Sequence, residues 1–408
     1  MNHDKKATQE IAYKLTGCSI HTFEIKIPLA NINTITHYKS TFGKQYKVNQ
    51  EYTDKLNKIY YSTIEQYKKG KAPLNYTYRR FYTAYYPSPY FQKYGISDLR
   101  YIEVHTIGKQ YNGTVIDRFF LIRVNPRKLL GYENYNHICL VLEEDIKRIA
   151  EVLENKMIKM GFSPYDIDNM KIHRLDICTN INLGSEERVS QYLQILRKGG
   201  CFRSLRHKIK EYDSVQHRYI FPDNEILYAN TYNAINKRLE ISIYDKKKQM
   251  ESQSNYYSKN QSEITEATGQ LRIELRIYSS KLNYHNKKIN GDFFADIFNL
   301  SHKFGEDLKS YLGIMFGTGR IITIEKAKTI IEQSSHHRET KDKMIEIIKN
   351  TSHKDMDFAF RRLRYPEKSR FIKYFNNLDI SPITVPKVWK TEFKSPIDYI
   401  ETNNVNQR

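Results

Sequence analysis

The chain has 408 residues, 39% of them hydrophobic and 27% charged, and its 66 Lys and Arg against 46 Asp and Glu give a formal net charge of +20. This composition excludes a disordered chain, and the length suits two domains or one large domain with an appendage. The excess of cations favours a polyanionic partner, above all nucleic acid, because each phosphate contacted by Lys or Arg releases counterions. A genome rich in A and T, which inflates Lys, Asn, Ile and Tyr, is the alternative explanation.

The cysteines and the amino-terminal segment bear on the compartment. Cys18, Cys139, Cys178 and Cys201 lie far apart with no C-x-x-C, which argues against a zinc knuckle or a disulfide framework and fits a reducing cytosol. Residues 1–15 have no apolar signal-peptide core, and no run of the chain approaches a membrane span. We therefore expect a cytoplasmic protein without a membrane partner.

The first two thirds of the chain mix strand and helix patterns. Residues 19–29, 98–108 and 118–131 read as strands, whereas 44–71 are charged and helix-like. Residues 140–161 form the clearest amphipathic helix, with apolar residues three and four positions apart and a glycine at the end. A strand over 170–184, a helix over 185–200 that begins with a Ser cap and two acids, and strands over 237–250 and 270–282 follow. The polar residues 251–269 are typical of a flexible loop.

From about residue 290 the pattern is helical throughout, and this shift marks the best candidate domain boundary. We expect an α+β protein whose residues 1–289 form a mainly antiparallel sheet with helices packed on one face. Residues 290–408 form a helical carboxy-terminal domain in this interpretation.

Three of the predicted strands carry an acid flanked by cations or a tyrosine on the face opposite their apolar residues. These polar sets are Arg174, Asp176 and Cys178; Arg272, Glu274 and Arg276; and Glu240, Ser242 and Tyr244. A half-buried strand normally carries bland polar residues on its outer face. If the three strands are neighbours in one sheet, Asp176, Glu274 and Tyr244 converge on one surface.

Such a surface suits metal-assisted phosphoryl transfer to tyrosine. Carboxylate oxygens are the ligands that Mg2+ and Mn2+ prefer, and the ion polarises the scissile phosphate. The tyrosine hydroxyl has a pKa of about 10 and needs nearby positive charge to ionise. Lys246 and Lys247 supply that charge, and Lys246 shares the face of Tyr244 if the strand continues.

Each of these motifs also has a purely structural interpretation. R-x-D and R-x-E-x-R on strands are often cross-strand ion-pair ladders, which contribute little to stability when solvated. Y-D-K-K-K is usually a strand end followed by a solvated run of charge. The order and spacing of the three motifs together favour a site.

In this order, the segments RFFLIRVNPRKLLG, IHRLDICTNI, RLEISIYDKKK and LRIELRIYSSKL, followed by a helical tail, resemble the gene II-type replication initiators of filamentous phages and related plasmids. The similarity reaches toward the Rep_trans plasmid initiators, and it covers roughly residues 117–282. It implies a relaxase-like nuclease domain in a bacterial cytoplasm. In this family a tyrosine at a strand end cleaves one DNA strand and stays attached to its 5′ phosphate, which assigns Tyr244 as the nucleophile with Lys246 beside it.

The resemblance further implies that Asp176 and Glu274 are ligands of Mg2+ or Mn2+. Glu103 or His105 is the candidate for a third ligand, with an ordinary strand face as the alternative. The His-hydrophobic-His signature of relaxases is absent from the sequence, so the expected site is rich in carboxylates. Tyr228 and Tyr232 are rival nucleophiles, but neither has a cation within two residues.

Basic segments supply the expected DNA contacts, with the solvated helix face as the alternative for each run. The candidate cations are Arg174, Arg272 and Arg276 on the strands, Arg203, Arg206, Lys208 and Lys210 after the second helix, and Arg361, Arg362, Arg364, Lys368, Arg370 and Lys373 in the tail. Residues 75–86 mix tyrosines with an Arg pair, as a stacking platform for a single strand would. No Walker loop is present, so unwinding would need a partner helicase.

The sequence thus predicts an enzyme that nicks and rejoins one strand at an origin to initiate rolling-circle replication, acting with the host replication machinery. The first rival is a relaxase of conjugative mobilisation, which uses the same chemistry. The second is a non-catalytic DNA-binding protein, such as an iteron-type initiator or a repressor, whose acids form only ion pairs. A homodimer is left open.

Overall fold

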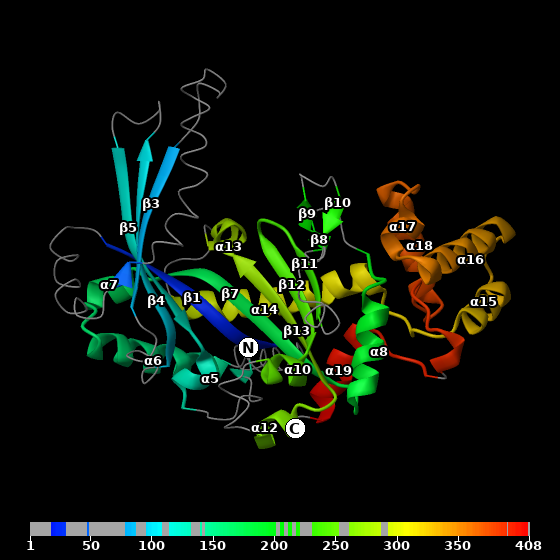
Figure 1. Cartoon of the computed structure of the whole chain (residues 1–408), viewed down its shortest axis with the longest axis horizontal. Helices are drawn as coiled ribbons and strands as arrows, with labels where there is room; N and C mark the ends of the chain where they lie inside the picture. The colour runs from blue at the N-terminus through cyan, green and yellow to red at the C-terminus, as the bar shows by residue number, and fades with distance from the viewer. Residues whose placement is uncertain are drawn as a thin grey trace, which may run out of the picture.

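The computed structural model describes residues 18–29, 47–48, 78–86, 95–107, 114–131, 139–140, 143–200, 205–207, 211–213, 218–220, 231–252, 261–286, 293–389 and 391–406. Within these ranges the protein is α+β, with an eleven-stranded sheet as its centre (Figure 1). The strand order is β2-β3-β4-β5-β1-β7-β13-β12-β11-β8, and β6 pairs with β1. The pairs between these strands are antiparallel, as the sequence predicts.

The strands of the sheet are β1 (Ser19–Pro28), β2 (Lys47–Val48), β3 (Tyr78–Tyr86), β4 (Ile96–Ile107), β5 (Thr114–Val124), β6 (Cys139–Leu140), β7 (Lys171–Asn182), β8 (Arg206–His207), β11 (Thr231–Ile235), β12 (Leu239–Asp245) and β13 (Gln270–Tyr278). A separate two-stranded sheet pairs β9 (Glu211–Asp213) with β10 (Arg218–Ile220). The helices are α5 (Pro126–Leu129), α6 (Glu143–Lys159), α7 (Pro164–Asp168), α8 (Glu186–Leu196), α10 (Lys246–Glu251), α12 (Gln261–Glu266), α13 (Ser279–Asn286), α14 (Phe293–Phe316), α15 (Ile324–Gln333), α16 (Arg338–His353), α17 (Met356–Phe360), α18 (Tyr365–Asn377), the short 3-10 helix η2 (Lys387–Trp389) and α19 (Pro396–Asn406).

The two helices that the sequence predicts most clearly, α6 and α8, form where expected. Ile146, Ile149, Leu153 and Met157 of α6 are fully buried, and Gly161 follows the helix with a φ of 91°. At the start of α8 the side chain of Ser185 accepts a hydrogen bond from the backbone N–H of Arg188 at 3.3 Å. Apolar periodicity and end signals therefore determine both helices.

One face of the sheet is apolar and carries the helices. Inward residues of β1, β7, β11, β12 and β13 form one continuous core with side chains of α6, α8 and α14. The long helix α14 runs along β7 and β1, and α8 packs on β11, β12 and β13 (Figure 1). The opposite face of the central strands is therefore the place for their polar residues.

The carboxy-terminal third is mainly helical and returns to the sheet at its end. The predicted boundary near residue 290 lies just before α14, which packs on the sheet, and α19 packs on both α14 and β7. Helices α15 to α18 extend away from the sheet (Figure 1). Among the described residues, no helix is long and apolar enough to cross a membrane.

Several predicted segments turn out differently or lie outside the described residues. The strand predicted over 237–250 ends at Asp245, and α10 begins at Lys246. The predicted loop over 251–269 contains helix α12. The predicted helix over 44–71 lies outside the described residues except for β2, and the proposed stacking platform is described only as the backbone of β3.

Candidate functional site

The three strands with polar motifs are neighbours in the order β7, β13, β12. Their register places Tyr244 opposite Arg272, Glu274 opposite Cys178, and Asp176 opposite Arg276. Because side chains alternate between the faces of a strand, these residues share the face opposite the apolar core. The convergence expected from the sequence is thus present in the fold.

Tyr244 and Glu274 are in direct contact. The phenol Oη of Tyr244 donates a hydrogen bond to Oε1 of Glu274 at 2.5 Å. Burial and the neighbouring Glu274 carboxylate raise the pKa of Tyr244 well above its usual range, although Arg272 opposes the shift. The resting phenol therefore keeps its proton and holds it against a carboxylate that is placed to accept it.

His21 is a third member of this cluster, and no motif in the sequence indicates it. Its Nδ1 lies 3.2 Å from the same Oε1 of Glu274. The β1–β7 register shifts between Ile20 and Thr22, so one extra residue of β1 is inserted at His21. Such a bulge lets His21 and Thr22 both reach the polar face. Burial lowers the pKa of His21, against the opposing effect of Glu274, which favours the neutral imidazole.

Asp176, by contrast, is held in ion pairs. It contacts the guanidinium of Arg174, lies 3.5 Å from Arg276 and accepts a hydrogen bond from Thr22 at 2.7 Å. Burial alone would raise its pKa, but the two arginines and Thr22 outweigh burial and hold the pKa below its usual value. Its lone pairs are used by protein donors, so Asp176 is a poor metal ligand in this arrangement.

The ion pairs of Asp176 extend on both sides. Glu240 accepts hydrogen bonds from Arg276 at 3.1 Å and from Tyr278 at 2.8 Å. Glu24 of β1 accepts from Arg174, Arg123 and Arg100 at 3.3, 2.6 and 3.3 Å. The network therefore crosses the sheet from β12 to β4, and it occupies two of the predicted DNA-binding cations, Arg174 and Arg276.

Arg272 and the lysines are placed differently from the expectation. Arg272 is 1% exposed and donates to Asn180 Oδ1 at 2.8 Å, so it is not a surface contact for DNA. Lys246 is fully buried at the start of α10, and burial lowers its pKa to about 6, with Arg272 adding to the shift. Lys247 pairs with Glu186 of α8. The prediction that Lys246 continues the strand face of Tyr244 is wrong, because Asp245 ends the strand and caps α10 through a hydrogen bond from Lys248 N–H at 3.0 Å.

The predicted metal ligands are not gathered in one place. Glu103 accepts hydrogen bonds from Tyr101 at 2.7 Å and Arg118 at 3.1 Å. It lies three residues from Arg100, which reaches Glu24, so alternation puts Glu103 on the other face of the sheet. The side chain of His105 lies outside the described ones. Across the described part of the chain, no group of three or more His, Cys, Asp or Glu side chains is placed to hold a metal ion.

The remaining candidates fall into three groups. Tyr232 is fully buried in the core and packs against Phe316, so it faces away from Tyr244, and Tyr228 lies outside the described residues. Arg203, Lys208 and Lys210 also lie outside them, as does the side chain of Arg206. Of the predicted DNA-binding cations of the tail, Lys368 is partly buried, and the exposed ones are Arg361, Arg362, Arg364, Arg370 and Lys373.

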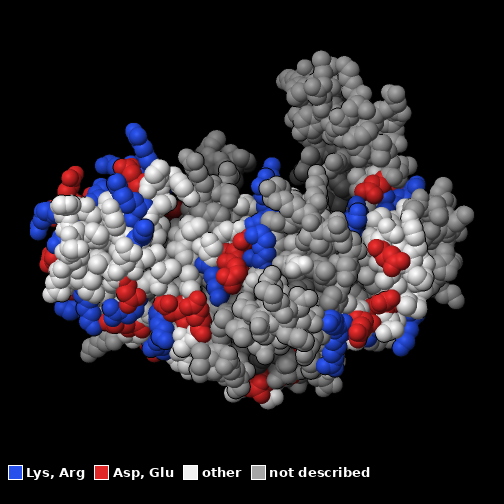
Figure 2. Space-filling model, turned by 180° about the vertical axis from the view of Figure 1, so that it is seen from behind, with Lys and Arg blue, Asp and Glu red and all other residues white. Residues whose placement is uncertain are grey.

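The charge of the described surface is mixed on one side of the molecule. Seen from behind, acidic and basic side chains alternate over the described surface, including the carboxy-terminal helices at the left of the view (Figure 2). The formal charge of +20 is therefore not gathered into one continuous basic field on the described part of this face.

Comparison with known proteins gives only a partial similarity. No family model matches the chain, and no solved structure matches it. One component of NADH-quinone oxidoreductase is 28% identical over 135 residues in Salmonella typhimurium and 27% identical over 135 residues in Escherichia coli K12. These matches cover 28% of this chain and only 15% of those proteins. The similarity is too short to assign the chain to a family.

Proposed function

We propose that this protein nicks and rejoins one strand of DNA through a covalent 5′-phosphotyrosine at Tyr244, and that it thereby initiates rolling-circle replication. The observation that carries the proposal is the 2.5 Å hydrogen bond from Tyr244 to Glu274 on the polar face of the central strands. A tyrosine nucleophile needs a proton acceptor within hydrogen-bond reach, and Glu274 meets that requirement. The proposed relaxase-like identity of the sheet rests on the same arrangement.

The proposed step can be written atom by atom. Oη of Tyr244 attacks the phosphorus, its proton passes to Glu274, and the bond from phosphorus to the 3′ oxygen breaks. The leaving oxygen takes up a proton from solvent water and becomes a free 3′ hydroxyl, while the 5′ phosphate remains on the tyrosine. Reversal of these events rejoins the strand, because the phosphotyrosine retains the energy of the phosphodiester.

A divalent ion remains part of the proposal. Of the two predicted carboxylate ligands, Glu274 contacts Tyr244 and His21, whereas Asp176 is taken up by arginines. Mg2+ or Mn2+ often binds through one carboxylate together with water and substrate phosphate. When bound, the ion would neutralise charge that develops on the phosphate. His21 lies beside Glu274, with its Nδ1 3.2 Å from the carboxylate.

A nicking assay tests the proposal. Supercoiled plasmid that carries the DNA flanking the gene is incubated with the protein and Mg2+ or Mn2+. We expect open circles and a protein–DNA adduct that survives denaturation with wild type, and neither product with Tyr244→Phe. An adduct formed by Tyr244→Phe contradicts the nucleophile assignment.

A second candidate function is that of a non-catalytic DNA-binding protein. The ion pairs of Asp176 and Glu240 favour it, since they are the contacts that a purely structural role of these acids requires. Binding of the flanking DNA without open circles or adduct would support this candidate. A mobilisation relaxase would give the same products as the replication initiator and differ in its partners.

A further inference from the structure

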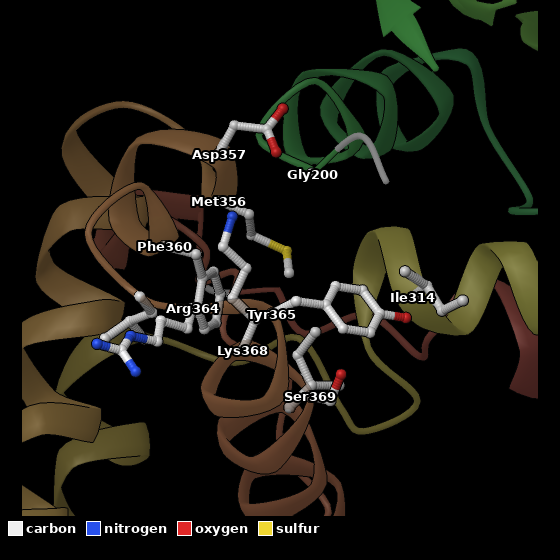
Figure 3. Close-up of a pocket in the computed structure, with 11 residues that line it drawn as sticks. Gly200, Ile314, Met356, Asp357, Phe360, Arg364, Tyr365, Lys368 and Ser369 are labelled. Atoms are coloured by element: carbon white, nitrogen blue, oxygen red, sulfur yellow. The ribbon is translucent and has the colours of Figure 1, made fainter. Parts of the chain in front are cut away.

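A pocket lies where helices α17 and α18 approach the end of α14 (Figure 3). Its volume is about 380 Å³, and its floor includes the buried side chains of Met356 and Phe360. Tyr365 and Ile314 lie at its mouth, together with Arg364 and Lys368. The pocket is thus apolar inside and positively charged at the rim.

The two large apolar groups at the mouth are unusually open to water. Tyr365 is 61% exposed and Ile314 is 41% exposed. The ring of Tyr365 extends across the mouth toward Ile314 (Figure 3). Apolar groups exposed at the edge of a pocket are accessible to a ligand that enters it, and an exposed tyrosine offers a flat face with a polar tip.

The charges at the rim favour an anionic ligand. Arg364 and Lys368 line the mouth, and the exposed Arg361 and Arg362 precede it along the chain. Of the nearby acids, Glu367 accepts a hydrogen bond from the backbone N–H of Arg364 at 2.8 Å and so caps its own helix. The other, Asp357, lies on the far side of the pocket from Tyr365 (Figure 3).

We propose that this pocket binds one unstacked base of single-stranded DNA, with Tyr365 stacking on the base and Arg364 and Lys368 contacting the adjacent phosphates. A nucleotide combines the flat apolar ring and the negative charge that the pocket and its rim fit. The pocket is within the size range of small-ligand sites. The inference rests on the proposed function in one respect, because nicking at an origin is what would present a separated strand.

Binding of a fluorescein-labelled oligothymidylate, followed by anisotropy, tests the pocket. The full-length protein carries Tyr244→Phe in every sample, so that cleavage does not interfere. Tyr365→Ala should weaken binding about tenfold, because stacking on one base is lost. Tyr365→Phe should bind as the parent does. Tyr165→Ala is the matched control, since Tyr165 of α7 is 63% exposed and lies outside the pocket.

Salt and duplex controls test the mode of binding. Arg364→Gln should lower the slope of log affinity against log salt by about 0.7, as expected for one phosphate contact on a single strand. Tyr365→Ala should weaken binding of a duplex of the same length much less than binding of the oligothymidylate.

The proposal is overturned if the parent does not bind oligothymidylate, if Tyr365→Ala binds as the parent does, or if single strand and duplex lose affinity equally. If Tyr365→Ala binds DNA as the parent does, the pocket would instead fit a peptide of a partner protein that carries both apolar and acidic side chains. Failure here is separate from failure of the proposed function, because wild-type nicking and adduct formation are measured independently of this binding.

Discussion

In the proposed mechanism Tyr244 can attack only if Glu274 takes its proton, since burial and Glu274 raise the pKa of the phenol. Glu274→Gln keeps the shape of the side chain but removes the proton acceptor. We expect it to slow adduct formation about a hundredfold or more, within the usual contribution of a general base. Single-turnover adduct formation on a denaturing gel measures this rate.

Glu103→Gln is the control for that substitution. Glu103 is a partly buried glutamate of the same sheet, hydrogen-bonded to Tyr101 and Arg118 on the other face. It should form adduct at the wild-type rate. Equal rates for Glu274→Gln and wild type would remove Glu274 from the mechanism.

The burial of Lys246 should make the stability of the protein depend on pH. Its pKa is lowered to about 6 by burial, whereas in the unfolded chain it titrates at its ordinary, much higher value. Between these two values the unfolded chain binds one more proton than the folded protein, so the free energy of unfolding rises with pH, by roughly 1 kcal/mol per pH unit. Lys246→Met should remove this contribution. Urea unfolding at pH 6.5, 7.5 and 8.5 measures the free energy of unfolding, and its rise with pH should be smaller in the variant than in wild type by about 1 kcal/mol per pH unit. Equal rises in both proteins would show that Lys246 is charged in the fold.

At the scale of elements, the turn that leads into β13 sets the position of Glu274. Gly269 has a φ of 76°, and a Cβ placed on it would lie 2.7 Å from the carbonyl carbon of Gly184. The turns meet through a hydrogen bond from Leu183 N–H to the Gly269 carbonyl at 2.8 Å. Gly269→Ala should therefore destabilise the protein by roughly 2 to 4 kcal/mol, through both positive φ and steric overlap.

Gly184→Ala is the matched control for the turn. Gly184 has a φ of 87°, but a Cβ on it would meet nothing within 4 Å. Only the backbone strain remains, which costs about 1 kcal/mol. Chemical denaturation measures both variants, and equal losses would show that the close approach of the two turns does not matter.

Most of the strands and helices near the site could be predicted from periodicity, and alternation identified the polar face of β7, β13 and β12, but the order in which these strands pair is known only from the fold. The bulge at His21 could not be predicted from the sequence, because an extra residue in one strand does not change the alternation of apolar and polar residues in SIHTFEIKI. The position at which β12 ends could not be predicted either, because the sequence does not show that Asp245 caps a helix instead of continuing the strand. The R-x-D motif contains the Arg174 partner of Asp176, but its contacts with Arg276 of β13 and Thr22 of β1 come from other strands, which that motif does not contain.

For the whole molecule, the sheet and the carboxy-terminal helices share one core. Ile400 of α19 is fully buried, and Tyr399 of the same helix packs edge-on against Tyr192 of α8. Helices α14 and α19 both pack on β7 and on each other. A chain divided near residue 290 would therefore expose the apolar side of β7, and the two parts are expected to unfold together.

The chain's one tryptophan allows this expectation to be tested. Trp389 lies in the carboxy-terminal part and is partly buried against the shared core. Its fluorescence reports the unfolding of that part, whereas far-ultraviolet circular dichroism reports the unfolding of the whole chain. The two urea midpoints should therefore coincide if unfolding is cooperative.

Ile400→Ala should lower the free energy of unfolding by about 2 to 5 kcal/mol, because it leaves a cavity between α19 and the sheet. Both urea midpoints should then fall together. Val388→Ala, at a side chain that is 81% exposed, should change neither midpoint. Two separate midpoints, with Ile400→Ala shifting only the fluorescence transition, would show instead that residues beyond the predicted boundary fold as an independent domain.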